Sequence, residues 1–293
     1  MKRVLITGAS SYIGTSFARY KPRHYSSKPC QSAQPRHSGS QSCHSGLDPE
    51  STFLSLRNQN WKEFDFSSFD TILHCAGIAH IPQKKEMREL YFNINCVLTV
   101  DVAKQAKAAG VKQFIFLSSM SVFEPQSFYG ASKLAAEEEL KALETNNFSI
   151  CILRPPMVYG YGCKGNFPRL VKLAATLPIF PNIQNARSMI YIDNLCEFIH
   201  MAIAENKTGT HHPQNTEYVN TTELAKLIAE IHGRRICTTK FFNWLIKILQ
   251  KKVKPLDKLF GSLTYEKTGN EADYNVVNFR DSVLTAILGK KIN

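Results

Sequence analysis

Residues 4–14 read VLITGASSYIG, and this stretch decides the fold class. Its apolar start predicts a buried strand, and the residues that follow predict a helix through about Tyr20. Gly8 permits a tight turn, and Gly14 permits close packing of the helix on the strand. A strand, a glycine-containing turn and a helix open a dinucleotide-binding unit, in which the helix N-terminus offers free N–H groups to a pyrophosphate. The middle position of the turn is Ser11 rather than glycine, which limits how closely the backbone approaches a phosphate. An ordinary strand-to-helix turn is the alternative.

Strands and helices alternate along the first half of the chain. Predicted strands cover 52–57, 71–76, 113–118 and 149–153, and predicted helices cover 86–109 and 130–144. This alternation predicts an α/β fold with a doubly wound, Rossmann-like parallel sheet. Beyond Arg154 the alternation weakens, and helices are expected near 166–175, 193–205 and 221–232. We therefore expect a dinucleotide-binding domain over 1–160 and a smaller, mixed substrate-binding region over 161–293 that is partly interleaved with the sheet domain.

Residues 21–51 interrupt this pattern. They are rich in Ser, Pro, Gln and His, contain almost no large aliphatic residues, and have no acidic residue before Asp48. A segment of this composition buries too little apolar surface to form a core, so we predict a flexible insertion. A basic binding arm is the alternative.

The composition is that of a globular protein with a hydrophobic core, because 43% of the 293 residues are hydrophobic and 20% are charged. No apolar run is long enough to cross a bilayer, and the run at 4–6 is too short for a signal peptide. Eight scattered cysteines without a CxxC pair are typical of reduced cytosolic thiols. We therefore expect a cytoplasmic protein with neither a disulfide framework nor a metal site.

The chain is strongly basic, with a formal net charge of +12. Such a charge is compatible with a phosphate-bearing substrate, a membrane surface or nucleic acid. The sequence has no zinc-finger spacing, RNP-like motif or bZIP heptads, which argues against nucleic acid. The apolar stretch 241–253 has lysines at or near its end and is compatible with a membrane surface. Packing of its apolar side on the protein body is the preferred interpretation.

A second motif carries the chemistry. Tyr129 and Lys133 are four residues apart and therefore lie on one face of a predicted helix. A nearby ammonium stabilises a phenolate and lowers the pKa of the tyrosine. Ser118 and Ser119 end the preceding strand, where a hydroxyl can hold a substrate oxygen beside the phenol. A strand-end serine, a helical YxxxK pair and a dinucleotide turn are together far more specific than any one of them.

With these motifs in order, the chain resembles the extended short-chain dehydrogenases/reductases, the family that contains the NAD-dependent epimerases and dehydratases. The resemblance covers most of the chain except 21–51 and includes TGASSYIG at 7–14, HCAG at 74–77, NINCVLT at 93–99, FLSSMSVF at 116–123, YGASK at 129–133, LRPPMVYG at 153–160 and RSMIYIDNL at 187–195. It implies a nicotinamide cofactor, a nucleotide-sugar substrate and, because such dimers are common in the family, a homodimer.

The resemblance also implies roles for individual residues. Tyr129 is expected to be the catalytic acid/base, Lys133 its partner on the nicotinamide ribose, and Ser119 the hydroxyl that holds the reacting sugar oxygen. Cofactor-binding residues are expected at Gly8, Ser11, Tyr12, Ile13, Gly14, Asp65, Phe66, Ala76, Gly77, Asn95 and Ser118, together with Tyr129 and Lys133. Asp65 and Phe66 are expected to flank the adenine. Substrate contacts are expected from Ser119, Asn166 and Arg187, whose planar guanidinium suits a diphosphate.

Two departures from the family pattern bear on the reaction. The second strand is followed by Arg57-Asn58 and not by the acid that binds the adenosine ribose, so NAD is expected with NADP left open. Dehydratases of the family place an Asp-Glu pair after the catalytic hydroxyl residue, where this chain has Met120-Ser121. The resemblance therefore favours C4 epimerisation of a UDP-hexose or UDP-N-acetylhexosamine for surface polysaccharide over dehydration. A keto-sugar reductase or dehydrogenase, or a catalytically impaired nucleotide-binding relative, is the alternative.

Overall fold

A computed structural model describes residues 2–8, 10–22, 52–79, 81, 84–124, 126–241, 243, 244, 248 and 260–289. From residue 23 onward the predicted insertion over 21–51 lies outside the described residues. Within the described ranges no helix combines the length and the apolar character needed to span a membrane.

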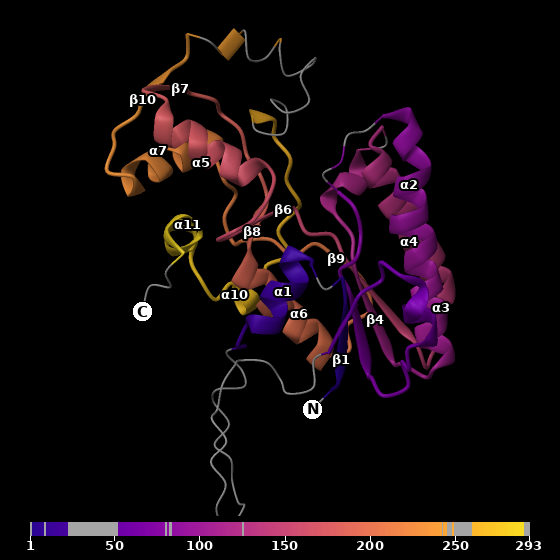
Figure 1. Cartoon of the computed structure of the whole chain (residues 1–293). Coiled ribbons are helices and arrows are strands. Elements are labelled where there is room, and N and C mark those ends of the chain that lie inside the picture. Colours follow the sequence, from indigo (N-terminus) through magenta and orange to yellow (C-terminus); the bar gives the residue numbers. More distant parts are fainter. Residues whose placement is uncertain are drawn as a thin grey trace, which may run out of the picture.

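The centre of the molecule is a six-stranded sheet in which every neighbouring pair is parallel (Figure 1). In spatial order the strands are β2 (Thr52–Leu54), β1 (Val4–Thr7), β3 (Thr71–His74), β4 (Gln113–Leu117), β5 (Ser149–Leu153) and β9 (Gly209–His211). The predicted doubly wound sheet is confirmed. The order turns around between β1 and β3, and in folds of this type ligands bind at such a reversal, outside the carboxyl ends of the strands.

The two faces of the sheet bury different side chains because successive residues of a strand point to opposite faces. Val4 and Ile6 of β1 belong to one buried cluster and Leu5 to another. The first cluster is covered by α1 (Tyr12–Arg19) and α6 (Ile192–Ala204), and the second by α3 (Leu98–Ala108) and α4 (Phe128–Leu143). Figure 1 shows α1 and α6 on one side of the sheet and α2, α3 and α4 on the other.

The helix predicted over 86–109 is a continuous helical segment in which the number of residues per turn changes. It runs through η3 (Lys85–Met87), α2 (Arg88–Phe92), the π-helical η4 (Asn93–Val97) and α3. A π-helical turn inside a longer helix frequently marks a functional site. Here the turn contains Asn95, one of the predicted site residues.

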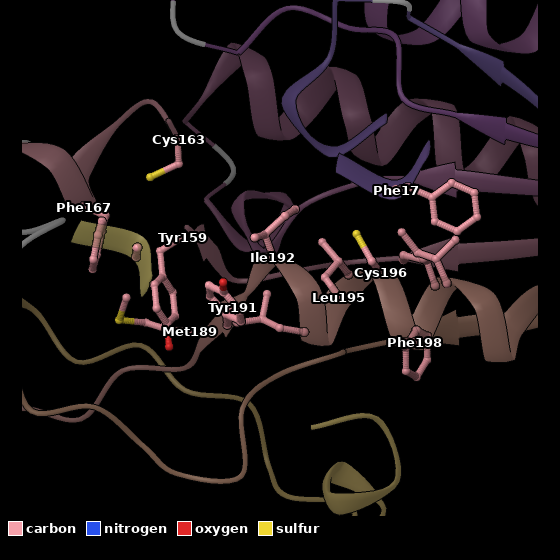
Figure 2. Close-up of a cluster of buried hydrophobic side chains, with 14 of the residues drawn as sticks. Phe17, Tyr159, Cys163, Phe167, Met189, Tyr191, Ile192, Leu195, Cys196 and Phe198 are labelled. Carbon is pink, nitrogen blue, oxygen red and sulfur yellow. The ribbon is translucent and has the colours of Figure 1, made fainter. Parts of the chain in front are cut away.

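The C-terminal half shares its core with the sheet domain. β9 is an outer strand of the main sheet, and α6 packs on α1, where Phe17 stacks on His200 with 4.4 Å between ring centroids. Figure 2 shows the buried side chains of this cluster, which include Phe17 of α1, Leu195 of α6 and Tyr159. The core is therefore continuous from the sheet into residues beyond 160.

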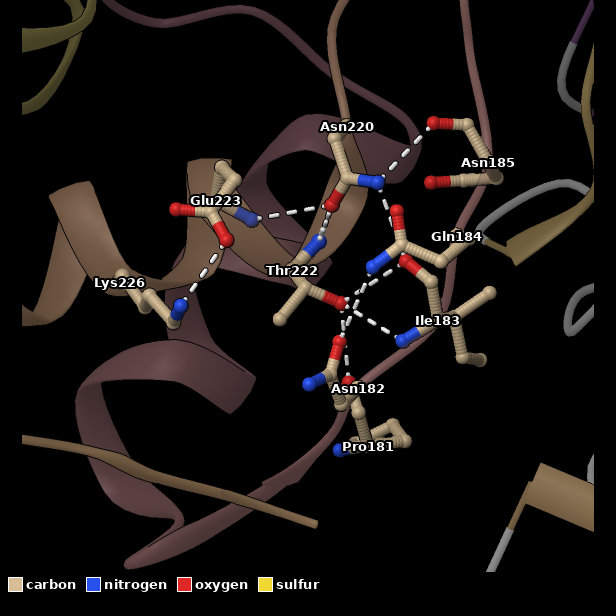
Figure 3. Close-up of polar contacts among 9 residues, drawn as sticks. All are labelled: Pro181, Asn182, Ile183, Gln184, Asn185, Asn220, Thr222, Glu223 and Lys226. Atoms are coloured by element: carbon tan, nitrogen blue, oxygen red, sulfur yellow. Dashed lines mark hydrogen bonds and ion pairs between the residues drawn. The ribbon is translucent and has the colours of Figure 1, made fainter. Parts of the chain in front are cut away.

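The remaining elements make up the rest of the C-terminal half. They are β6 (Met157–Tyr159), α5 (Asn166–Thr176), β7 (Ile179–Pro181), β8 (Met189–Tyr191), α7 (Thr221–Ile231), β10 (Cys237–Thr239), α10 (Glu271–Tyr274) and α11 (Phe279–Leu288). β6 pairs with β8 and β7 with β10. Asn220 caps α7 by accepting from the N–H of Thr222 at 2.9 Å, and it donates to the carbonyls of Ile183 and Asn185 at 3.1 Å each (Figure 3).

Candidate active site

The predicted cofactor loop lies at the carboxyl end of β1, against the segment that follows β3. Gly8 has φ +89°, and a Cβ added there would lie 2.8 Å from the backbone nitrogen of Ala76. Only glycine satisfies both the left-handed conformation and this close approach. The two segments predicted to contact the cofactor are thus in direct contact with each other.

The α1 N-terminus explains the two remaining key positions of the loop. Ser11 is the N-cap, and its Oγ accepts from the N–H of Gly14 at 3.4 Å. A Cβ on Gly14 would lie 3.1 Å from Cγ2 of Ile6, so the glycine lets the helix approach β1. Tyr12 and Ile13 form the first turn, where N–H groups have no intrahelical acceptors and the helix dipole favours an anion.

Asn95 holds the turn after β3 in place. Its side chain is buried, accepts from the N–H of Ile78 at 2.8 Å, and donates to the carbonyl of Ile78 and to Oγ of Ser132 at 3.0 and 3.1 Å. Both amide protons therefore have protein partners. Asn95 supports the site by joining the Gly77–Ile78 turn to α4.

Lys133 is buried at the same place. Its Nζ donates to the carbonyl of Leu117 at 2.8 Å and lies 4.4 Å from the ring centroid of Phe116. Burial lowers the pKa of Lys133 to about 8, against the opposing influence of Cys75 and Glu137. A Cβ on Gly77 would lie 3.3 Å from this Nζ, so the glycine keeps the space beside the ammonium open.

Tyr129 and Ser119 meet one turn before Lys133. Tyr129 is half-buried, and the side chain of Ser119 lies beside its phenol. Burial raises the pKa of Tyr129, and the neighbouring Ser119 hydroxyl opposes this rise. Oγ of Ser119 also accepts from the N–H of Ser121 at 3.1 Å, which fixes the hydroxyl at the end of β4.

A buried ion pair lies behind this pair of hydroxyls. Glu137 is fully buried and accepts from Oγ of Ser118 and from Nε of Arg154, the latter at 3.0 Å. Neither Glu137 nor Arg154 is among the site residues predicted from the sequence. The available signal was the spacing of four residues between Lys133 and Glu137, which places both on one face of α4. Ser118, predicted to bind cofactor, uses its hydroxyl in this network.

For the other predicted residues, the structure shows contacts with residues other than Ser119 and Tyr129. Asp65 is exposed and accepts from the N–H of Ser67 at 2.8 Å, and the adjacent Phe66 is 1% exposed within the second core cluster. Asn166 is the first residue of α5. Arg187 is half-buried, and its Nη1 donates to the carbonyl of Gly261 at 2.5 Å.

Arg57 brings a cation to the cofactor loop. It follows β2, is exposed, and its Nη2 donates to Oγ of Ser10 at 3.2 Å. In this fold the residue at the end of the second strand faces the adenosine ribose. The arginine is therefore placed beside the loop at the position where the sequence lacks an acid.

These residues fit a nicotinamide dinucleotide. Gly8 and Gly77 provide space that a side chain would fill, the first turn of α1 provides N–H groups, and Lys133 provides a cation beside Gly77. Within the described ranges no group of three or more His, Cys, Asp or Glu side chains is arranged to hold a metal ion.

Comparisons with known proteins agree with this geometry. Residues 4–218 match the model of the "NAD dependent epimerase/dehydratase family". The chain is 28% identical to a UDP-glucose 4-epimerase of Vibrio cholerae, over 89% of this chain and 86% of that protein. It is 27% identical to the N-acetyl-alpha-D-glucosaminyl-diphospho-ditrans,octacis-undecaprenol 4-epimerase of Escherichia coli O157:H7, over 78% of this chain and 71% of that protein.

Solved structures share the fold. The crystal structure of a dTDP-4-dehydrorhamnose reductase from Bacillus anthracis, in complex with NADP, aligns with a TM-score of 0.65 at 18% identity. The alignment covers 99% of this chain and 100% of that one.

Proposed function

The chain belongs to the NAD dependent epimerase/dehydratase family, and from this premise we propose that it epimerises a diphosphate-linked sugar at C4 with Tyr129 as acid/base. The family is NAD(P)-dependent, so the prediction of a nicotinamide cofactor is confirmed. The observation that carries the proposal is the placement of the Ser119 side chain beside the phenol of Tyr129 at the end of β4, one helical turn from the buried ammonium of Lys133.

The residues divide the chemistry between them. Tyr129 takes the proton of the C4 hydroxyl and returns it at the end of the reaction. Ser119 holds the same oxygen, since its hydroxyl is fixed beside the phenol by the N–H of Ser121. Lys133 supplies positive charge that favours the phenolate and binds the ribose of the cofactor. The bound cofactor supplies the acceptor and donor for the hydride of C4.

The residues after Ser119 disfavour dehydration. Elimination of water from the sugar needs a carboxyl pair, and the positions that follow are Met120 and Ser121. Met120 is 5% exposed and belongs to the protein interior. Epimerisation needs only the two hydroxyls, the ammonium and the cofactor.

A UDP-linked hexose or N-acetylhexosamine is the proposed substrate class. One relative is named for a UDP-sugar and the other for a sugar on a polyprenyl diphosphate, so a sugar diphosphate is common to both. Arg187 suits this group because guanidinium binds a diphosphate with two parallel hydrogen bonds. Asn166, at the start of α5, is the second proposed contact.

A keto-sugar reductase is the second candidate, and Arg57 is the observation that favours it. A cation beside Ser10 at the end of β2 suits the 2′-phosphate of NADP, and reductases consume NADPH as a reagent. Proton NMR of the purified protein with UDP-N-acetylglucosamine or UDP-galactose and a trace of NAD⁺ separates the two. An epimerase gives a new 4-epimer signal without consuming cofactor.

The variant Tyr129→Phe tests the assigned acid/base. We expect turnover to fall by about 10²–10⁴-fold, the usual contribution of a positioned acid/base, while cofactor binding is retained. Tyr161→Phe removes a phenol that is 66% exposed and serves as the matched control. Near-normal turnover of Tyr129→Phe would show that the assignment is wrong. If the wild-type protein gives no epimer signal but oxidises NADPH when a keto-sugar is supplied, the chain is a reductase.

A further inference from the structure

Three large apolar side chains are exposed on the segment after β10. Phe241, Trp244 and Ile248 have 73%, 63% and 51% of their surfaces exposed. Their spacing of three and four residues is that of side chains on one face of a helix. The remaining residues of 241–253, apart from Asn243, lie outside the described residues, so the expectation that the apolar side of this segment packs on the protein body stays a prediction, and the three exposed side chains lie apart from any such contact.

The start of this segment is fixed to the protein. The N–H of Phe241 donates to Oγ1 of Thr239 at 3.1 Å, and Nδ2 of Asn243 donates to the carbonyl of Asn182 at 2.7 Å. Thr239 is the last residue of β10 and Asn182 directly follows β7. Trp244 is thus exposed although the residue before it, Asn243, is hydrogen-bonded to the protein.

The surrounding sequence is strongly basic. Between residues 234 and 258 there are eight Lys or Arg residues and one acid, Asp257. Arg235 and Lys240, next to the apolar face, are exposed. Apolar side chains flanked by such a cluster combine the two attractions that hold a protein on an anionic lipid surface, namely burial of apolar groups and electrostatic attraction.

We propose that the face formed by Phe241, Trp244 and Ile248 docks on the surface of an anionic lipid bilayer. The tryptophan suits the interface because its ring is apolar and its N–H polar. A second copy of this chain is a poor occupant, since each copy carries the same excess of basic residues in the sequence around this face. The segment 21–51 is also a poor occupant because its four Lys or Arg residues outnumber its two acids. This proposal does not depend on the proposed reaction.

The two tryptophans of the chain allow a direct test. Trp61 is 5% exposed and Trp244 is 63% exposed, so the variant Trp61→Phe leaves a single reporter on the proposed face. The full chain is mixed with vesicles of phosphatidylcholine alone, or of phosphatidylcholine with phosphatidylglycerol, and followed by emission and sedimentation. We expect a blue shift of the Trp244 emission and co-sedimentation with the anionic vesicles, both weakened by salt.

Substitutions distinguish binding through this face from nonspecific binding to vesicles. The combined variant Phe241→Ser, Trp244→Ser and Ile248→Ser is expected to bind anionic vesicles at least about tenfold more weakly, because it loses the apolar contribution to binding. Val97→Ser, at a position that is 51% exposed on η4, is the matched control and is expected to bind normally. Should the combined variant fail to fold, Arg235→Glu with Lys240→Glu is expected to weaken binding similarly.

Three results would overturn the proposal. The first is no binding of the intact protein to anionic vesicles. The second is equal binding by the intact protein and the combined variant. The third is a concentration-dependent dimer, seen by light scattering without lipid, that the same three substitutions abolish. Epimerase activity on a water-soluble UDP-sugar is measured in parallel, so failure of the docking proposal is distinguishable from failure of the proposed function.

Discussion

Gly130 is the residue after the proposed acid/base, and replacing it by alanine tests how the site is assembled. A Cβ at this position would lie 2.0 Å from the carbonyl oxygen of Ser121 and 2.8 Å from its carbonyl carbon. Both are backbone atoms of η5 (Met120–Phe123), the turn that follows Ser119. The variant must therefore move η5 away from α4, and with it the Ser119 hydroxyl that lies beside the phenol of Tyr129.

The size of the effect follows from these distances. Carbon and carbonyl oxygen approach to about 3.3 Å in favourable contacts, so the two segments must separate by roughly 1 Å. Overpacking costs about 1–3 kcal/mol, and the better helix propensity of alanine returns about 1 kcal/mol. We therefore expect Gly130→Ala to lose at most about 2 kcal/mol of unfolding free energy. A misplacement of 1 Å in an active site can lower turnover by about 10²-fold.

Two measurements on the same variant give the test. Denaturant unfolding reports the free energy, and the NMR epimerisation assay reports turnover. Ala142→Ser adds one heavy atom at an exposed position of the same helix and is the matched control, expected to keep full turnover. Normal turnover of Gly130→Ala would refute the reasoning, because it would show that the Ser119–Tyr129 geometry does not depend on the contact between α4 and η5.

Two further predictions concern buried charge. Glu137→Gln leaves the cation of Arg154 without its carboxylate. We therefore expect the unfolding free energy, measured in urea, to fall by about 3–5 kcal/mol. A loss below about 1 kcal/mol would contradict the structural role of the ion pair. Burial lowers the pKa of His74 to about 3, below the 6.5 of the unfolded chain. The unfolded chain therefore binds the extra proton as pH falls from 6.5 towards 3, and stability should fall by up to about 1.4 kcal/mol per pH unit. In His74→Gln this contribution to the pH dependence of the unfolding free energy should vanish, which unfolding curves taken across that pH range would show. An unchanged pH dependence would exclude His74 as its source.

The centre of the sheet could be predicted from the sequence because β1, β3, β4 and β5 are buried on both faces. Such strands are continuous apolar runs, and the predicted strand at 149–153 coincides with β5. β2 is shorter than predicted and ends at Leu54, because the residues after it are largely exposed. β9, with only three residues, carries no periodicity that a sequence can reveal. Its pairing with β5 joins residues far apart in the sequence, so the local sequence does not indicate it.

The ion pair behind the site could not be predicted for a different reason. Glu137, Glu138 and Glu139 form one run of like charge, which in a helix is typical of a solvated face. The structure exposes Glu138 and Glu139 and buries Glu137, whose partner Arg154 follows another strand. Which member of such a run turns inward depends on the partner, and the partner is set by the sheet order.

The hydrogen bonds of the two serines in the cofactor loop, Ser10 and Ser11, are related to the position of Arg57. In a loop of three glycines, the backbone approaches the pyrophosphate closely and binds it through N–H groups alone. Here Ser11 uses its hydroxyl to cap α1, which satisfies the N–H of Gly14, while Ser10 accepts from Arg57. One backbone donor is therefore already occupied, and a cation is hydrogen-bonded to the neighbouring serine. The position that lacks the glycine thus carries a helix-capping hydroxyl, and the end of the second strand, which lacks the acid, carries a cation.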